Sequence, residues 1–262
     1  MTYETLSIEK NLEQHYAVIT LNRPANFNAI STQLARDMLA VLNVIEEDDE
    51  IWAAIITGTG EKAFCSGADL KERKTMTKAQ MIAQRKLFVK MFTAISVFPK
   101  PLIAAMNGVA FGGGFEIALG CDWIVAAENA ILSLSEVSIG VIPAGGGTQN
   151  MSRAIGKLKA KQLILTAKRL TAAEAKEWGL VARVTPQADL MKAAVEEVAS
   201  ITKNAPIAVY QAKKSINFGV DLDLYTGLVL EAEAYNAALY SEDRDEGLAA
   251  FNEKRKPVYK GR

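Results

Sequence analysis

The stretch from Asn107 to Gly147 opens with NGVAFGGGFE (107–116) and closes with EVSIGVIPAGGG (136–147). Each end therefore holds a cluster of glycines with a carboxylate on its flank. The glycines at 112–114 come just before the apolar run Ile-Ala-Leu (117–119), and this order predicts a turn that leads into a helix. Glycine suits such a turn because it accepts positive φ angles and lets other groups come close to the main chain.

The start of such a helix offers unpaired N–H groups and a partial positive charge. This helix end could bind a phosphate, a carboxylate or a developing oxyanion. Glu116 would lie in its first turn, within reach of whatever those N–H groups hold. The alternative is a tight turn between packed elements, in which Glu116 only favours the helix dipole. The stretch by itself leaves both interpretations open.

The composition is that of a globular protein of one large domain, or of one domain with a smaller appendage. Half of the 262 residues are apolar, and 30 Lys and Arg balance 30 Asp and Glu. A balanced charge gives no global field that would attract nucleic acid or an anionic membrane. Cys65 and Cys121 form neither a disulfide framework nor a metal-ligand spacing. The sequence shows no secretory signal or membrane-spanning run, so we expect a cytoplasmic location.

Short apolar strands alternate with helices over the first two thirds of the chain, and this alternation predicts an α/β core. A wholly helical tail follows. Capping boxes at Thr77/Gln80 and Thr171/Glu174 mark two helix starts. The predicted strands cover 17–21, 52–57, 102–106, 123–127, 131–134 and 180–184, and the predicted helices 32–45, 77–96, 148–168, 188–203, 206–218, 223–240 and 242–255. The segment 64–72 is predicted as a short strand that turns through Gly67 into a helix.

Several kinds of site are excluded by the sequence. Neither glycine cluster matches the dinucleotide or the nucleoside-triphosphate glycine motif. The only histidine is His15, so a Ser-His-Asp triad or a histidine-rich metal site is not expected. The remaining candidates for a general acid or base are carboxylates, lysine and tyrosine. Glu116 and Glu136 stand out because each lies beside glycine-rich backbone in apolar sequence, where desolvation would raise a carboxyl pKa towards neutral.

Two glutamates that converge on one small site could hold a water molecule and divide its proton transfers. Taken alone, either Glu116 or Glu136 is more commonly a capping or ion-paired residue. The sequence alone does not place the two side chains together.

Five blocks resemble the signature blocks of the crotonase (enoyl-CoA hydratase/isomerase) superfamily, in the order and at spacings compatible with that family. They are FCSGADLKE (64–72), GGGFE (112–116), LSE (134–136), IPAGGGTQ (142–149) and FNEKR (251–255). The resemblance implies an α/β fold, a crotonase-like spiral of β-β-α units. It also implies a core with the active site in residues 1–200 and a C-terminal helical trimerisation region in residues 201–262. The expected assembly is a homotrimer or a dimer of trimers.

The resemblance further implies an acyl-CoA thioester substrate. The backbone N–H groups of Ala68 and Gly113 would form the oxyanion hole for its carbonyl oxygen. Phe251 and Lys254 would complete the site, and in this family such residues often come from a neighbouring subunit. The residues implied in substrate and CoA binding are Ser66, Ala68, Asp69, Leu70, Lys71, Gly112, Gly113, Phe251 and Lys254.

Glu116 and Glu136 match the two catalytic glutamates of the hydratase branch, so we predict an enoyl-CoA hydratase of fatty-acid or branched-chain acyl-CoA degradation. Glu136 would activate the water that adds at Cβ, and Glu116 would protonate Cα. No metal or cofactor is expected beyond the coenzyme A that the substrate carries. One alternative is a Δ3-Δ2-enoyl-CoA isomerase that uses a single glutamate. Another is an RNA-binding or scaffold homologue without turnover.

The segment GADLKER (67–73) and the tail from Asp223 to Arg262 are most similar to the methylglutaconyl-CoA hydratase group, one member of which also binds AU-rich RNA. RNA binding there is associated with a lysine-rich first helix. Here the corresponding helix, Gln33 to Glu50, holds one basic residue, Arg36, so we expect no nucleic-acid binding. Asn150 departs from the arginine common after Gly-Thr-Gln. We expect the acyl pocket wall to come from residues 71–90 and the C-terminal helices, whereas the acyl preference stays open.

Overall fold

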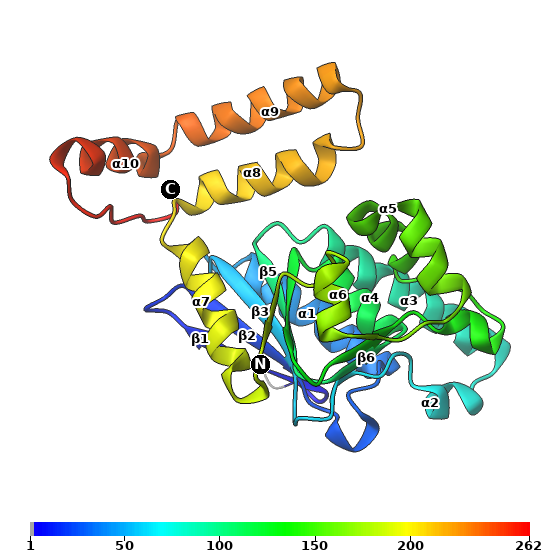
Figure 1. Ribbon diagram of the computed structural model, residues 1–262. Coiled ribbons are helices and arrows are strands. Elements are labelled where there is room, and N and C mark those ends of the chain that lie inside the picture. The colour runs from blue at the N-terminus through cyan, green and yellow to red at the C-terminus, as the bar shows by residue number, and fades with distance from the viewer. Residues whose placement is uncertain (1–2) are drawn as a thin grey trace.

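The computed structural model describes residues 3–262, and two sheets organise it (Figure 1). The first sheet has the strand order β1-β2-β3-β5-β7-β10 and the second the order β4-β6-β8-β9. The first contains β1 (Leu6–Asn11), β2 (Tyr16–Leu21), β3 (Ala53–Gly58), β5 (Leu102–Met106), β7 (Trp123–Ala127) and β10 (Arg183–Thr185). The second contains β4 (Ala63–Cys65), β6 (Val109–Phe111), β8 (Ile131–Ser133) and β9 (Leu170–Thr171).

The chain repeats one unit: a strand in the first sheet, a strand in the second sheet, then a helix. Strands β3 and β4 lead to α2 (Leu70–Lys74) and α3 (Lys78–Ser96), and β5 and β6 lead to α4 (Gly113–Gly120). Strands β7 and β8 lead through a 3-10 turn to α5 (Gly147–Leu165). Equivalent strands of successive units pair in parallel in both sheets. The predicted spiral of β-β-α units is therefore confirmed.

Helices cover both faces of the first sheet. Alternate residues of β3 show this: Ala54 and Ile56 pack in the main core, which includes α1 (Thr32–Glu46), whereas Ala53 and Ile55 pack against α7 (Leu190–Thr202). Every residue of β3 is buried as a result, which confirms the strand predicted from a continuous apolar run.

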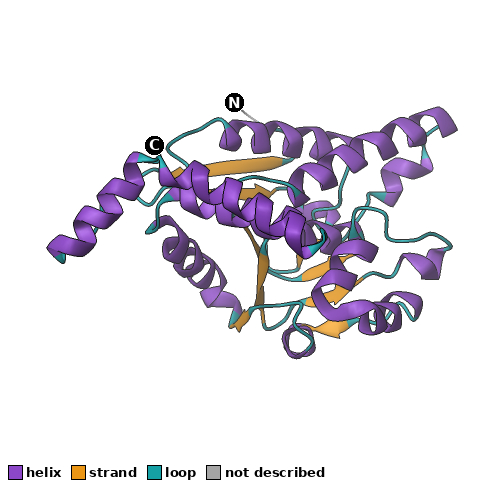
Figure 2. Ribbon diagram, turned by 90° about the horizontal axis from the view of Figure 1, so that it is seen from above, coloured by secondary structure: helices purple, strands orange, loops and turns teal. Residues whose placement is uncertain are grey.

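The last three helices project beyond the sheets, as Figures 1 and 2 both show. They are α8 (Pro206–Gly219), α9 (Leu224–Leu239) and α10 (Glu242–Glu253). The Lys213 ammonium ties α8 to the core through an ion pair of 2.7 Å with Asp122. The arrangement is compatible with the division at residue 200, which stays a prediction. Within residues 3–262, none of the helices combines the length and the hydropathy needed to cross a membrane.

Several local predictions are confirmed. Both capping boxes form, at the start of α3 and of α6 (Ala172–Glu177). Both cysteines are free and buried, and burial raises the pKa of the Cys65 thiol to about 12. His15 stacks on Trp52 with a ring-centroid distance of 3.8 Å, which is a packing role.

Other predictions are wrong in detail. Strand β1 was not predicted, because LSIEKN has only two apolar residues and forms an edge of the sheet. The strand predicted over 180–184 begins only at Arg183, since Leu180 and Val181 pack in the core before it. Strands β7 and β8, predicted around a turn, belong to different sheets. The helix predicted over 148–168 bends at Gly156, whose φ is 79°.

One close backbone approach positions the site. A side chain at Gly114 would overlap the carbonyl oxygen of Cys65, so only glycine lets the start of α4 lie against the end of β4. The next glycine, Gly113, lies beside Ala68: a Cβ at Gly113 would be 3.8 Å from the Ala68 nitrogen. The fold therefore brings two peptide units from separate β-β-α repeats together.

Candidate active site

Ala68 and Gly113 present their backbone N–H groups side by side. A parallel bridge between Ile30 and Ala68 holds the loop after β4, through hydrogen bonds from Ile30 N to Gly67 O (2.8 Å) and from Asp69 N to Ile30 O (2.9 Å). This pattern uses the carbonyl oxygen of Gly67 and the N–H of Asp69 but not the N–H of Ala68. Gly113 begins α4, so its N–H has no partner within the helix. Within residues 3–262, neither N–H donates a hydrogen bond.

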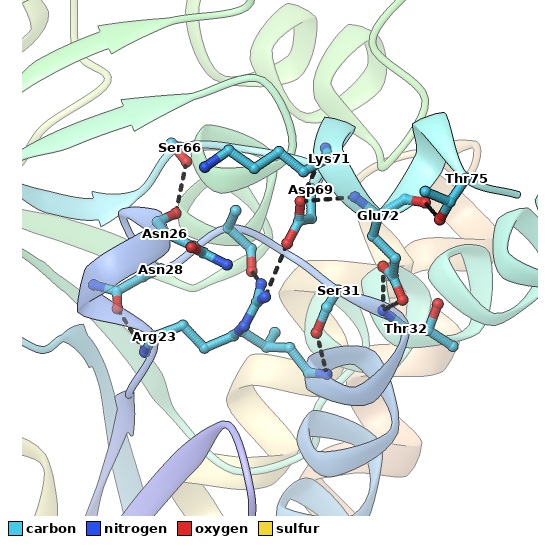
Figure 3. Close-up of polar contacts among 12 residues, drawn as sticks. Arg23, Asn26, Asn28, Ser31, Thr32, Ser66, Asp69, Lys71, Glu72 and Thr75 are labelled. Carbon is cyan, nitrogen blue, oxygen red and sulfur yellow. Dashed lines mark hydrogen bonds and ion pairs between the residues drawn. The ribbon is translucent and has the colours of Figure 1, made fainter.

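A polar network fixes the loop that carries Ala68 (Figure 3). The Asp69 carboxylate accepts hydrogen bonds from the N–H groups of Lys71 and Glu72, both at 3.1 Å, and so caps α2. It also pairs with Arg23 at 2.8 Å. Burial raises the pKa of Asp69, but the hydrogen bonds from Arg23 and from α2 outweigh it and hold the pKa below its usual value. Asp69 thus shapes the loop.

A cavity of about 410 Å³ opens in front of the two N–H groups. Ala68, Gly113, Glu116 and Glu136 all line this cavity, although they come from three successive repeats of the fold. The remaining lining residues are Ile30, Ser66, Gly67, Leu70, Arg73, Arg85, Phe88, Phe92, Phe111, Gly112, Ser135, Ser138, Ile139, Val141, Ile142, Ala144 and Gly145. The convergence that the sequence could not establish is therefore present in the structure.

Glu116 lies in the first turn of α4, as predicted, and only 4% of it is exposed. Its Oε1 accepts hydrogen bonds from the N–H groups of Gly145 (2.6 Å) and Gly147 (2.9 Å). A Cβ at Gly145 would be 2.7 Å from Glu116 Oε2, so the second glycine cluster is needed for this contact. Burial raises the pKa of Glu116, against the opposing effects of these N–H groups and of Arg85.

Glu136 begins the 3-10 turn Glu136–Ile139. Its Oε2 is buried and has no hydrogen-bond partner among the described residues. Burial, with a further contribution from the charge of Glu116, raises the pKa of Glu136 to about 7. The two carboxyl groups therefore influence each other's titration, and one of them changes charge near neutral pH. Glu136 lines the cavity, so a water molecule bound there can lie beside its carboxyl group.

Four of the predicted binding residues do not line the cavity: Asp69, Lys71, Phe251 and Lys254. Phe251 is 82% exposed on α10, and Lys254 ends that helix, in the part of Figure 1 remote from α4. This chain's own fold does not bring either residue to the cavity. Their role in a site shared with a neighbouring subunit stays a prediction.

Sequence reasoning missed part of the cavity wall. The expected residues 71–90 do contribute, through Arg73, Arg85 and Phe88, but the C-terminal helices of this chain do not. The segment 135–145 lines the cavity instead, and the apolar run Gly-Val-Ile-Pro before the second glycine cluster was its only signal. Within residues 3–262, no three His, Cys, Asp or Glu side chains gather as a metal site would.

Known proteins resemble this chain over nearly its whole length. The family model for enoyl-CoA hydratase/isomerase matches residues 11–262. The putative enoyl-CoA hydratase/isomerase YngF of Bacillus subtilis is 49% identical, over 95% of each chain. The short-chain-enoyl-CoA hydratase of Clostridium acetobutylicum is 42% identical, over 98% of this chain and 97% of the other.

The same family emerges from the comparison of structures. The crystal structure of an enoyl-CoA hydratase from Bacillus anthracis superposes with a TM-score of 0.95, at 43% sequence identity, and covers 99% of this chain and 100% of that one. The family model, the similar proteins and the repeated β-β-α spiral all indicate the same family. This chain belongs to the enoyl-CoA hydratase/isomerase family and has the crotonase fold.

Proposed function

We propose that this chain catalyses the reversible addition of water across the 2,3 double bond of a 2-enoyl-CoA thioester, giving a 3-hydroxyacyl-CoA. One observation carries the proposal: the buried Glu116, the half-buried Glu136 and two unpaired N–H groups line a single cavity. The relative from Clostridium acetobutylicum is named a short-chain-enoyl-CoA hydratase, and this name supports the same reaction.

The N–H groups of Ala68 and Gly113 act on the thioester. When both N–H groups donate to the carbonyl oxygen, they draw electron density from the conjugated double bond. Cβ then becomes electrophilic, so that water can add to it. The negative charge that develops on the oxygen is stabilised by donors that are already in place. In enzymes generally, the loss of one such donor lowers kcat by roughly 10²–10³.

Glu136 and Glu116 divide the proton transfers. The ionised Glu136 takes a proton from the bound water as the water oxygen bonds to Cβ. Glu116, in its protonated form, supplies the proton that Cα receives, and the enolate collapses to the saturated thioester. Burial raises the pKa of both carboxyls, which brings each towards the range where proton transfer at neutral pH is efficient. After turnover, proton exchange with solvent restores the starting state.

This mechanism uses the thioester itself as the electron sink. We therefore propose that no cofactor is needed beyond the coenzyme A that the substrate carries. A Δ3-Δ2-enoyl-CoA isomerase would need one carboxylate to move a proton between two carbons. The presence of both Glu116 and Glu136 in the cavity wall favours hydration, because a second carboxyl group is then available to activate water.

A cytoplasmic location is also part of the proposal. The relatives from Bacillus subtilis and Clostridium acetobutylicum support it, whereas a relative at 37% identity from Arabidopsis thaliana is named mitochondrial. The absence of nucleic-acid binding stays a prediction.

The last three helices carry a surface suited to self-association. A groove of about 750 Å³ runs between α8, α9 and α10, and large apolar side chains such as Tyr235, Leu248 and Phe251 are exposed along it. Large exposed apolar surfaces of this kind mark interaction sites. We propose that residues 201–262 join three copies of the chain, or six as a dimer of trimers.

Glu116→Gln and Glu136→Gln should each lower the hydration rate. Each variant keeps the shape of the side chain but cannot exchange a proton, so kcat should fall by roughly 10²–10⁴. The measurement is the loss of conjugated enoyl-thioester absorbance with crotonyl-CoA. Glu128→Gln, at an exposed glutamate after β7, is the matched control and should retain the wild-type rate. An intact rate in Glu136→Gln would contradict hydration by this pair.

The pH profile should report the ionisation of Glu136. Glu136 must be ionised to take a proton from water, and burial raises its pKa to about 7. Below this value kcat/KM should therefore fall by about tenfold per pH unit as Glu136 becomes protonated. A kcat/KM for crotonyl-CoA that stays constant from pH 7 down to pH 5 would be incompatible with this assignment.

The assembly is expected to have three or six times the chain mass of 28.4 kDa, as measured by light scattering after size-exclusion chromatography. Leu228→Glu, on the exposed side of α9, should dissociate it, because a charge cannot be buried there without a partner. Leu12→Glu, an equally exposed leucine between β1 and β2, is the control and should leave the mass unchanged. A wild-type monomer at micromolar concentration would refute the proposed association.

A further inference from the structure

A single peptide group connects Arg85, on α3, with Glu116. The carbonyl oxygen of Ala144 accepts a hydrogen bond of 2.8 Å from Nη2 of Arg85. The N–H of the same peptide group belongs to Gly145, and it donates to Oε1 of Glu116 at 2.6 Å. Arg85 therefore acts on Glu116 indirectly, through the two polar ends of the peptide group between residues 144 and 145.

This peptide group is packed closely against the side chains around it. A Cβ at Gly145 would lie 2.6 Å from the Phe92 ring and 2.7 Å from Glu116 Oε2, so the bare backbone of residue 145 touches both side chains. Gly147 donates a second hydrogen bond to Glu116 Oε1, at 2.9 Å. Both bonds end at the same oxygen, and together they fix the orientation of the Glu116 carboxyl group.

The charge of Arg85 strengthens the same hydrogen bond to Glu116. A donor on the carbonyl oxygen polarises a peptide group, and the N–H of that group then becomes a better donor. Burial raises the pKa of Glu116, whereas the N–H groups of Gly147 and Gly145 and the positive charge of Arg85 lower it. The geometry and the electrostatics therefore both favour negative charge on Glu116.

Two further charged residues line the cavity, and neither could replace Arg85 in this role. Glu136, on the 3-10 turn, has the same sign of charge as Glu116. Arg73, on α2, donates through Nε to Gln84 Oε1 at 2.9 Å, on α3 itself. Within residues 3–262, Arg85 is the only cationic side chain that donates to the segment 144–147.

We infer that Arg85 is a positioning residue for proton transfer by Glu116, and that it acts through the peptide group between Ala144 and Gly145. When Glu116 gives its proton to Cα, the O–H bond breaks, the C–H bond forms and the electron pair stays on the carboxylate. The N–H that Arg85 polarises stabilises this negative charge as it develops. The inference rests on the proposed hydratase function and adds a residue that need not touch the substrate.

Arg85→Met should lower kcat for the hydration of crotonyl-CoA by about tenfold, the factor expected for one hydrogen bond from a charged donor, with little change in KM. The pH above which kcat/KM falls should move upward, because Glu116 holds its proton more tightly without the nearby positive charge. Arg85→Lys keeps the charge and can still donate to the Ala144 carbonyl, so it should restore most of the rate and the wild-type pH profile. Lys86→Met is the matched control, because Lys86 is an exposed cation next to Arg85 that does not line the cavity.

A double-mutant cycle with Glu116→Gln gives the decisive comparison, with the residual rate measured at high enzyme concentration. If Arg85 acts through Glu116, Arg85→Met should cause no further loss of rate in the Glu116→Gln protein. A loss of the same factor in both backgrounds, or a loss confined to KM, would assign Arg85 to direct contact with the substrate and overturn the inference. So would a wild-type rate and pH profile in Arg85→Met. If the wild-type protein does not hydrate crotonyl-CoA, it is the proposed function that fails.

Discussion

The contact between the backbone of Gly114 and the carbonyl group of Cys65 is the constraint on which the site depends. It places the start of α4 directly against the end of β4, where any side chain at position 114 would collide. Three features follow from this one approach. The N–H of Gly113 comes next to that of Ala68, Glu116 in the first turn of α4 enters the core, and the glycine cluster 145–147 can fold over its carboxylate. The packing of the backbone thus determines where the two N–H groups and the Glu116 carboxyl group lie.

The buried carboxyl group of Glu136 lowers the folding stability of the protein at neutral pH. Burial raises the pKa of Glu136 from 4.5 to about 7, so the folded state favours the protonated carboxyl. Folding stability is therefore lost as the pH rises between these two values, when the unfolded chain has already released its proton. The sheets offset this cost: β3 is buried along its whole length, and helices cover both of its faces. A rigid, fully covered scaffold can hold a partly unsatisfied acid in position.

Much of this organisation could be predicted from the sequence, and the exceptions have physical reasons. Glu116 was correctly placed in a first helical turn, because three glycines before an apolar run leave few other structures. The β-β-α repeat was expected only from the family resemblance and not from the residue pattern, since a strand of three residues such as β6 is set by the sheet it joins. Arg73 and Arg85 were not singled out, because a charged residue on a helix usually belongs to a solvent-exposed face. Phe251 and Lys254 do not line the cavity of this chain, and their role at a neighbouring subunit stays a prediction.

The account is tested most directly by a crystal structure of the protein with butyryl-CoA, a saturated thioester that cannot be hydrated. The account predicts a carbonyl oxygen about 2.7–3.1 Å from both the Ala68 and the Gly113 nitrogens. It also predicts a water molecule near Cβ that contacts both Glu116 and Glu136. A thioester bound with its carbonyl oxygen away from these two N–H groups, or with only one of the two carboxyls beside Cβ, would contradict it.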